Sequence, residues 1–473
     1  MNPQQTESAR EYEGKALIAD PIYQYLLFTV PLPGESAEKT EKDLIDTSWV
    51  QRLRRIYQLQ SARWVYPAAE HTRFQHSLGT MHMAGEFGRH LYPSLKEIFP
   101  DVPSINCVEE LLRVAGLLHD VGHGPYGHFF DDNFLDRYGI THEDMGQEII
   151  RRKLGRIISR IRRSPAGPFD PGESLSPEQV AFLIRKPAAR ERTGQPKWLH
   201  FLRQLFSGIY TVDNIDYVQR DAYVTGFSMD IVDIQRLCFY SFFTREGLTL
   251  HQAGTSVLSR FLNARLNLYA NVYYHRTTRA IDLHLQEIFR ETMELMIQGN
   301  PLKDLDAYLD LDEWKLYREV EGWKRLKDRR KRKLAQEWEK LYQRQVKWKM
   351  SFAAELSIDQ IQKGARFAEA GDYERQIRQK LPPRLRGIRF KVDLATQDPR
   401  PVNPMVEQDR RITIFNPSTN RISLEPLQEI YRFIPARIVH FRVFSLNHAY
   451  DGELTAAAET SLGSIGDTIK TNI

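Results

Sequence analysis

The chain has 473 residues, of which 41% are hydrophobic and 11% aromatic, so it can bury a sizeable core and wholesale disorder is excluded. Its formal net charge is +5, a mild basic excess. The two cysteines, Cys107 and Cys238, are far apart in no CxxC pattern, which argues against a disulfide scaffold or a thiolate zinc site and fits a reducing cytosol. The polar N-terminus is not a signal peptide and no apolar run could cross a bilayer, so we expect a soluble, cytoplasmic protein with no membrane partner.

The first part of the chain is predicted to be an extended segment followed by helices. Residues 16–30 have the composition of a short strand or extended lead-in, broken at Asp20-Pro21, and 31–43 is a polar loop. Apolar residues then recur at the spacing of one helix face, namely Ile45, Trp49, Leu53, Ile56 and Leu59. Further helical patterns cover 76–91, 108–119, 143–163, 199–225 and 255–297.

The chain changes character near residue 300. Residues 303–350 alternate charged residues with Trp and Leu, as an exposed or interface helix would, and from about 384 the pattern becomes strand-like. The predicted strands are 388–394, 411–415, 421–424 and 437–444. We therefore predict a mainly α protein with a smaller mixed α/β C-terminal lobe. Its expected parts are an N-terminal segment (1–43), a helical catalytic core (44–300), a charged helical region (301–383), the C-terminal lobe (384–450) and a flexible tail (451–473).

One stretch, LLRVAGLLHDVGHGPYGH at 111–128, carries the strongest functional signal. An apolar run typical of a buried helix ends at His119-Asp120, and a loop rich in Gly and Pro follows, with His123 and His128 inside it. An imidazole and a carboxylate at the end of a buried helix are half of a divalent-metal site.

The other half of this site can be sought elsewhere in the chain. HTRFQHS places His76 at the start of a helix, and TVDNIDYVQRD places Asp213 on a helix crowded with carboxylates. Together with His119 and Asp120, they would put two imidazoles and two carboxylates around one ion, with open positions for water and substrate. That ligand set suits Mn, Fe, Mg or Zn acting as a Lewis acid. The residues alone therefore predict metal-assisted phosphoester hydrolysis.

The order His76, His119-Asp120, Asp213 resembles that of the HD-domain phosphohydrolases. RFQHSLG, HDVGHGPYGH, the pair His142-Glu143 and DNIDYVQRD are closer still to one branch, the deoxynucleoside triphosphate (dNTP) triphosphohydrolases that include the SAM- and HD-domain enzymes. The resemblance covers roughly residues 46–300. It implies a helical HD-domain core that hydrolyses a dNTP to a deoxynucleoside and inorganic triphosphate, with a divalent metal as cofactor.

The resemblance also implies roles for the loop that follows the His-Asp pair. His128 resembles the histidine that faces the scissile phosphate and supplies a proton to the leaving 5′ oxygen. Asp131 and His142 resemble the partners that orient it and tune its pKa, as a base or acid near neutrality requires. His123 is similar to a further active-site histidine.

Contacts to the triphosphate follow from the same resemblance. Arg73 and Arg265 match the family's phosphate-binding arginines, whose guanidinium groups would clamp a dense negative charge. Asn214 stands where the relatives carry a phosphate-binding lysine, so one positive charge is missing from this clamp. The departure puts triphosphate affinity in question without touching the metal ligands.

Contacts to the nucleoside are implied in the same way. Tyr217 and Asp221 resemble residues beside the sugar, and Gln58 with Leu59 resembles the wall that detects the sugar hydroxyl and excludes a 2′-OH. Tyr273 resembles the aromatic residue that stacks on the base. Its neighbour at 274 is a tyrosine in place of the family's glutamine, which leaves base choice open.

Asp46, Gln51 and Arg54 match part of an activating nucleotide site that the family's animal members build between subunits. Their presence favours an oligomer and an activating nucleotide, although the lysine and asparagine expected around Ala16 and Ala19 are absent.

Two other functions stay open at this stage. One is a different HD-type activity, such as a nucleotidase or phosphodiesterase. The other is a nucleotide-sensing or nucleic-acid-binding protein that uses the basic runs at 151–163 and 324–333, since such runs attract polyanions.

Overall fold

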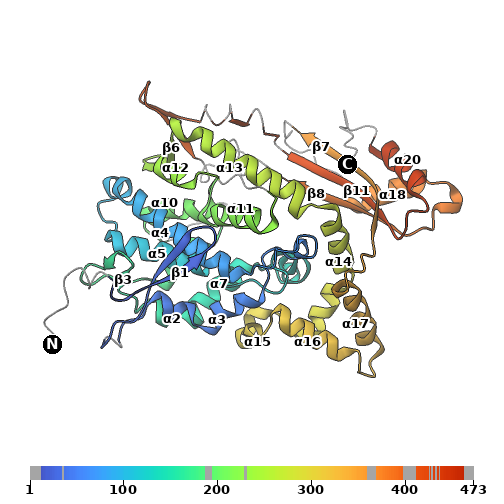
Figure 1. Ribbon diagram of the computed structural model, residues 1–473, viewed down its shortest axis with the longest axis horizontal. Helices are drawn as coiled ribbons and strands as arrows, with labels where there is room; N and C mark the ends of the chain where they lie inside the picture. Colours follow the sequence, from blue (N-terminus) through green and yellow to red (C-terminus); the bar gives the residue numbers. More distant parts are fainter. Residues whose placement is uncertain are drawn as a thin grey trace.

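Two long helices form the centre of the fold in the computed structural model (Figure 1). α4 (Arg73–Ile98) begins at Thr72, which forms a capping box with Gln75, and α5 (Ile105–Leu118) begins at Ser104, whose hydroxyl accepts from the Cys107 amide. α5 is buried over nearly its whole length and packs along α4, which confirms the predicted helices 76–91 and 108–119. The structure describes residues 12–34, 37–186, 194–227, 232–358, 369–397, 412–424, 427, 430, 431, 434, 435 and 437–462.

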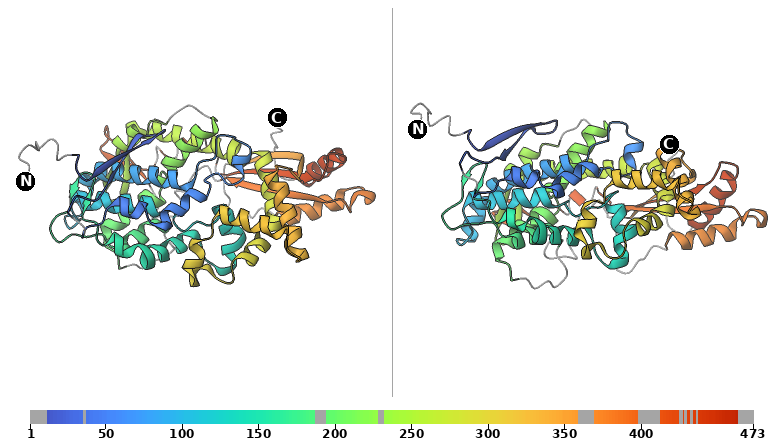
Figure 2. Two further views of the ribbon diagram at one scale, coloured as in Figure 1. Left: turned by 60° about the horizontal axis from the view of Figure 1, so that its bottom comes forward. Right: turned by 90° about the horizontal axis from the view of Figure 1, so that it is seen from below.

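The predicted extended segment 16–30 forms a hairpin, whose two strands lie on either side of the predicted break at Asp20-Pro21. β1 (Lys15–Asp20) pairs antiparallel with β2 (Gln24–Thr29), and Figure 2 shows this hairpin at the surface of the helical body. The apolar face predicted between Ile45 and Leu59 is buried, but a single helix does not carry it. Thr47 accepts a hydrogen bond from the Val50 amide and so starts a new helix, which divides the segment. The pieces are α2 (Glu41–Ile45), α3 (Ser48–Gln51) and a 3₁₀ turn, η1 (Arg52–Arg55).

The later helical patterns are interrupted in the structure. The segment predicted over 143–163 ends before Arg163 and contains a π-helical turn, and the one predicted over 255–297 is broken by another at Tyr269–Tyr273. π-helical turns inside α-helices are frequent at functional sites, and the second one lies at the cavity described below. The elements are α7 (His142–Ile149), η5 (Ile150–Leu154), α8 (Gly155–Ile158), β3 (Arg163–Ser164), β4 (Gly167–Pro168), α9 (Pro177–Ile184), α10 (Lys197–Ser207), α11 (Val212–Thr225), α12 (Ile234–Phe239), β5 (Ser241–Thr244), β6 (Gly247–His251), α13 (Thr255–Leu268), η7 (Tyr269–Tyr273) and α14 (Arg276–Met296).

The charged region after residue 300 forms three helices, α15 (Leu305–Leu309), α16 (Glu313–Trp323) and α17 (Arg329–Tyr342). α17 packs against α14 and α16, and the three helices run along the bottom of Figure 1 toward its right. Trp338 of α17 is fully buried, and its indole nitrogen donates to Thr292 Oγ1 of α14 over 2.8 Å. These helices therefore share the core of the catalytic body.

A three-stranded antiparallel sheet, with strand order β7-β11-β8, occupies the end of the molecule away from the N-terminus (Figure 1). β7 (Lys349–Ile358) was not predicted; β8 (Phe390–Gln397) and β11 (Arg437–Ser445) were. α18 (Ala370–Lys380) and α20 (Asp451–Leu462) pack on this sheet over a separate apolar core. β9 (Thr413–Asn416) and β10 (Arg421–Ser423) instead extend the β5–β6 sheet of the helical body.

The prediction of a flexible tail after Asp451 was wrong for its first part. Residues 451–462 form α20, because Leu454, Ala458 and Leu462 recur on one face and are buried against the sheet. The remainder of the predicted tail lies outside the described residues. Among the described residues, no helix combines the length and the apolar character needed to span a lipid bilayer.

Candidate active site

The four predicted metal ligands converge from α4, the end of α5 and α11. His76 Nε2 lies 3.1 Å from His119 Nε2 and 3.1 Å from Asp213 Oδ1, and His119 Nε2 lies 3.3 Å from Asp120 Oδ1. Donor atoms about 2.1 Å from a shared ion are themselves about 3.0–3.4 Å apart, so these separations match the edges of one coordination sphere. His76, His119 and Asp213 each bring a donor atom within 4.8 Å of the others and therefore fit a single divalent cation, and Asp120 lies at the edge of this group, 3.3 Å from His119 and 3.8 Å from His76.

The tautomers of the two imidazoles support the same conclusion. His76 Nδ1 is 2.8 Å from Asp216 Oδ2, and His119 Nδ1 is 2.7 Å from the carbonyl oxygen of Gly116, so each Nδ1 donates. Both Nε2 atoms are therefore directed toward each other and toward Asp213, and each would offer its lone pair to a bound cation. Asp216, which orients His76, lies on the same helix as Asp213 and had no role in the sequence analysis.

Asp216 is itself held in place. Both of its oxygens accept hydrogen bonds of 2.9 Å from Arg220, which also pairs with Asp20 of β1 over 2.9 Å. A Cβ on Gly79 of α4 would lie 1.8 Å from Asp216 Oδ1, so only glycine allows α11 to approach α4 this closely. A chain of buried contacts thus runs from the N-terminal hairpin to the metal ligand His76.

The electrostatics of the centre favour a positive charge. Burial lowers the pKa of His76, but hydrogen bonds to Asp213 and Asp216 outweigh it and raise this pKa to about 10. Burial favours the neutral acid at Asp120, yet the neighbouring His119 and Arg73 hold the pKa of its carboxyl well below the usual range. The carboxylates therefore stay ionised.

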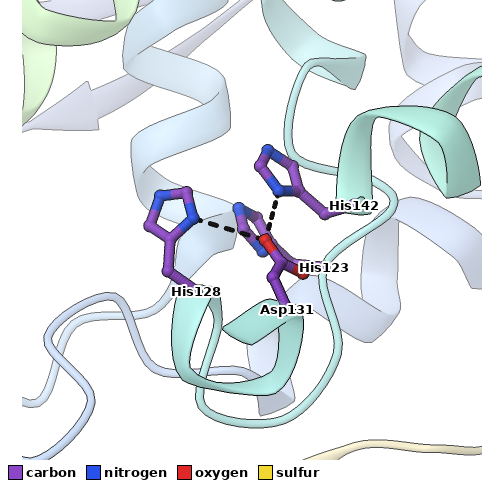
Figure 3. Close-up of side chains that lie close together, drawn as sticks. All are labelled: His123, His128, Asp131 and His142. Carbon is purple, nitrogen blue, oxygen red and sulfur yellow. Dashed lines mark hydrogen bonds and ion pairs between the residues drawn. The ribbon is translucent and has the colours of Figure 1, made fainter. Parts of the chain in front are cut away.

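The histidine loop forms a second cluster beside the first (Figure 3). Asp131 Oδ2 lies 2.5 Å from His142 Nδ1 and 3.4 Å from His128 Nδ1, so one carboxylate orients two imidazoles. Burial raises the pKa of Asp131, but the hydrogen bonds from both histidines outweigh it and hold this pKa far below its ordinary value. The His128 side chain is 61% exposed and is therefore accessible to a bound substrate.

His123 links the two clusters. Its ring stacks on that of His142 with centroids 3.7 Å apart, and its Nε2 lies 3.3 Å from Asp120 Oδ1. Burial keeps the pKa of His123 well below its usual value, so the ring is neutral. His123 does not line the cavity, unlike His128 and His142.

The glycines explain why this loop can hold its histidines. A Cβ on Gly122 would lie 2.0 Å from the carbonyl oxygen of His142, and one on Gly127, whose φ is +53°, would lie 2.2 Å from the Arg73 guanidinium. Tyr126, which lies between these two glycines, has a φ of +66°, a backbone conformation that residues other than glycine rarely adopt. α6 (His128–Phe130) and the π-helical turn η3 (Asp131–Leu135) follow directly.

One cavity of about 430 Å³ joins these groups. His76, His119, Asp120 and Asp213 line one part of it. Six of the seven predicted substrate residues also line it: Gln58, Leu59, Arg73, Tyr217, Asp221 and Tyr273. Asp221 accepts a hydrogen bond of 2.6 Å from the Tyr273 hydroxyl and lies 2.9 Å from His71, so the wall expected at the sugar is rigid.

Arg265 is the predicted substrate residue that the structure places elsewhere. Its Nε donates to the hydroxyl oxygen of Tyr217 over 3.0 Å, so the guanidinium lies behind Tyr217 instead of lining the cavity. Arg73, the other predicted phosphate contact, lines the cavity and donates to Asp120 Oδ2 over 2.7 Å. Lys186, which sequence analysis did not single out, lines the same cavity and pairs with Glu143 over 3.2 Å.

The structure also adds Arg279 and Asp282, which no motif indicated, to the wall at Tyr274. Tyr274, Arg279 and Asp282 line the cavity from the start of α14 and the turn before it. Arg279 binds Asp393 of β8, and the Tyr274 hydroxyl donates to the carbonyl oxygen of Thr396 over 2.8 Å. The C-terminal sheet therefore supports one side of the cavity. This side could be recognised only from the contacts that Arg279 and Tyr274 make with β8.

The predicted activator residues lie away from this cavity. Gln51 accepts from Arg54 Nε over 2.8 Å, the Arg54 guanidinium lies 3.6 Å from the centre of the Phe74 ring, and Asp46 pairs with Lys42. Their role stays a prediction. Some residues of both basic runs pair within the chain: Arg151 with Glu178, Lys153 with Asp306 and Arg330 with Glu291.

Residues 73–185 match the HD domain family. The chain therefore contains an HD domain. The match contains His76, the His119-Asp120 pair and the histidine loop, whereas Asp213 lies downstream of it.

Curated relatives extend the similarity of this HD-domain protein beyond the matched segment. It is 29% identical over 282 residues to the uncharacterized protein YwfO of Bacillus subtilis (59% of this chain, 56% of the relative). It is 27% identical to a deoxynucleoside triphosphate triphosphohydrolase SAMHD1 homolog of Dictyostelium discoideum (62% and 54%) and 30% identical to deoxynucleoside triphosphate triphosphohydrolase SAMHD1 of Gallus gallus (59% and 48%). The matched region thus spans about half the length of these relatives.

A solved structure shares the fold over nearly the whole chain. It is the crystal structure of a hypothetical protein from Aquifex aeolicus, which aligns with a TM-score of 0.64 at 22% identity and covers 95% of this chain and 100% of that one. At this identity the likeness concerns the fold alone.

Proposed function

We propose that this HD-domain protein is a metal-dependent dNTP triphosphohydrolase. The observation that carries the proposal is that one cavity brings together a metal-binding ligand set, two histidines of the loop and a wall of aromatic and polar residues. Such a cavity offers separate regions to a phosphate chain and to a nucleoside. The two SAMHD1 relatives named above support dNTPs as the substrate class.

His76, His119, Asp120 and Asp213 would hold the metal. A divalent ion bound there supplies Lewis-acid polarisation of a phosphate oxygen and lowers the pKa of bound water. Mn, Mg, Fe and Zn are the candidate ions, and the experiment below compares the first two.

The histidine loop supplies the proton. Asp131 holds His128 by Nδ1, so Nε2 of the exposed ring is directed away from that carboxylate, and the protonated ring can donate its Nε2 proton to the leaving 5′ oxygen and regain one from the attacking water. His142 shares the same carboxylate and lines the cavity beside His128. Arg73 adds a fixed positive charge that stabilises the phosphate oxygens as charge grows on them.

The remaining wall would select the nucleoside. Gln58 and Leu59 face the cavity at the position expected for the sugar, with Tyr217 and Asp221. The Tyr273 ring borders the same cavity and offers a stacking surface for the base. An oligomer and an activating nucleotide at Asp46, Gln51 and Arg54 belong to the same proposal.

Product analysis tests this function directly. The purified protein is incubated with each dNTP, singly and mixed, with Mn²⁺ or Mg²⁺, and products are separated by ion-exchange chromatography. We expect deoxynucleoside and intact triphosphate, with a rate more than about 100-fold lower in Asp120→Asn. Asp233→Asn is the matched control, because Asp233 caps α12 away from the cavity and asparagine caps a helix equally well.

Each other outcome has a defined meaning. Release of phosphate or pyrophosphate would replace the proposed reaction with another HD-type hydrolysis. No turnover of any nucleotide, with salt-sensitive binding of single-stranded nucleic acid, would favour the binding protein instead. Activity confined to dNTP mixtures would support the activating site.

A further inference from the structure

A segment outside the matched HD domain holds the histidine loop from behind. The hydroxyl of Tyr308 donates to the carbonyl oxygen of Gly122 over 2.8 Å. Arg52, which is fully buried, donates to the carbonyl oxygen of His123 over 2.7 Å and to that of Leu311 over 2.6 Å. The loop and residues 308–311 are thus joined by hydrogen bonds to backbone atoms, which leave the histidine side chains free.

Glu313, the first residue of α16, makes the most consequential of these contacts. Its carboxylate is fully buried, and its Oε1 accepts from the backbone amides of both Tyr57 (3.1 Å) and Tyr126 (3.2 Å). Its Oε2 accepts from the Tyr317 hydroxyl over 3.0 Å and lies 3.7 Å from an Arg63 nitrogen. Every partner needed by a buried carboxylate is therefore present.

The two amides bound by Glu313 belong to two different walls of the cavity. Tyr57 immediately precedes Gln58, and Tyr126 stands two residues before His128; both Gln58 and His128 line the cavity. One carboxylate oxygen therefore sets the distance between the loop expected at the sugar and the loop expected at the scissile phosphate.

The loop needs this support because it is strained. Tyr126 has a φ of +66°, and the left-handed conformation costs a residue other than glycine about 1–2 kcal/mol. Such a conformation persists only where surrounding contacts impose it. The Tyr126 ring is fully buried against Trp64, Phe289 and Trp338, and Glu313 holds its amide.

We propose that Glu313 is a positioning residue, which aligns His128 and Gln58 across the cavity through the amides of Tyr126 and Tyr57. The proposal rests on the proposed phosphohydrolase function, and it assigns a role to the charged helical region that carried no motif. Glu313 touches neither the metal ligands nor the substrate cavity, so it acts on the rate through the loops alone.

Three substitutions separate geometry from charge. Glu313→Gln keeps an oxygen where the two amides donate but removes the charge. Glu313→Asp keeps the charge but withdraws the oxygens by one methylene, and Glu313→Leu removes the acceptor. Leu334→Ala, at a buried position of α17, is the matched control, because it loosens the same helical region and leaves the hydrogen bonds from Glu313 to the two loops in place.

We expect Glu313→Gln to keep kcat within about 5-fold, and Glu313→Asp and Glu313→Leu to lose about 10- to 100-fold in kcat, since misplacement by about 1 Å can reduce a rate 100-fold. The KM for dNTP should change less than about 3-fold, and the Mn²⁺ stoichiometry should stay that of the wild type. Backbone amide exchange in peptides covering 56–59 and 122–128 should be faster than in the wild type in Glu313→Asp and Glu313→Leu. It should be unchanged in Glu313→Gln and Leu334→Ala.

The outcomes decide the proposal even if one variant does not fold. Wild-type kcat in Glu313→Asp, or loss of kcat in Glu313→Gln as large as in Glu313→Asp, would overturn it. Equal amide exchange in all variants would overturn it as well. If the wild type hydrolyses no dNTP, the proposed function fails by itself, because the exchange experiment still tests whether Glu313 holds the two loops.

Discussion

Asp216 offers the sharpest test of the metal centre, because the structure gives it a role that is separable from ligation. It orients His76 through Nδ1 at 2.8 Å and does not itself face the other ligands. In Asp216→Asn an amide oxygen at the Oδ2 position can still accept from His76 and Arg220 Nε, but the NH₂ group then faces the Nη2 donor of Arg220; the reverse orientation turns the NH₂ group toward His76 Nδ1. In both orientations the charged acceptor of the His76 ring is lost, so the ring is less firmly oriented.

The expected magnitude follows from this geometry. Removing the partner that orients a metal-bound histidine lowers metal affinity about 10- to 100-fold, which corresponds to about 1.4–2.7 kcal/mol. Breaking a buried ion pair costs about 3–5 kcal/mol of stability, and the loss here should be smaller because Arg220 keeps its 2.9 Å contact with Asp20.

Calorimetric titration of the metal-free protein with Mn²⁺ measures the affinity, and urea unfolding measures the stability. Asp233→Asn serves as the control, since it makes the same chemical change at an exposed helix cap. A dissociation constant in Asp216→Asn within about 3-fold of the wild type, in a folded protein, would refute the assignment of Asp216 as the residue that orients His76.

Three further predictions concern the loop, the C-terminal sheet and its last helix. Gly122→Ala should lower kcat more than about 10-fold and lower the melting temperature, because the new Cβ would meet the carbonyl oxygen of His142 at 2.0 Å; unchanged kinetics would contradict the packing of the loop. Burial, aided by Arg442, lowers the pKa of His440 to about 4, so the unfolded chain binds a proton that the folded chain does not as pH falls from 6.5 to 4. The free energy of unfolding should therefore fall by about 3 kcal/mol through that window, and His440→Gln should flatten the pH dependence of thermal unfolding there; a wild-type profile in the variant would exclude this contribution. Leu454→Ala should lower the free energy of unfolding measured in urea by about 2–5 kcal/mol, and a change below 0.5 kcal/mol would mean that α20 does not pack on the sheet as described.

The sequence predicted the central helices and the chemistry of the metal ligands because those signals are local. A buried helix that ends in His119-Asp120 can be inferred from apolar periodicity and from the glycines that follow, since both depend on neighbours within a few residues. The same inference gave the wrong helix boundaries where apolar periodicity continues from one helix into the next. The apolar face between Ile45 and Leu59 is buried, but Thr47 caps a new helix inside it.

The site could be predicted only as a set of residue types. The order of motifs brought His76 and Asp213 to the same centre, yet no local pattern showed that Asp216 holds His76 or that Arg265 lies behind Tyr217. Those contacts depend on how closely α11 approaches α4 and α13 approaches α11, and these distances are set by close packing, including the absence of a Cβ at Gly79.

By itself the sequence determined the ligands, the glycine-rich loop and the helical character of the body, because each depends on short-range sterics and side-chain chemistry. Only the tertiary structure decided that α16 sends Glu313 to Tyr57 and Tyr126, and that β8 supports Arg279 at the cavity. The partners in these contacts lie more than 100 residues apart in the chain. A buried carboxylate accepts hydrogen bonds from whichever amides the packed helices place beside it, and that placement depends on the packing of the whole core.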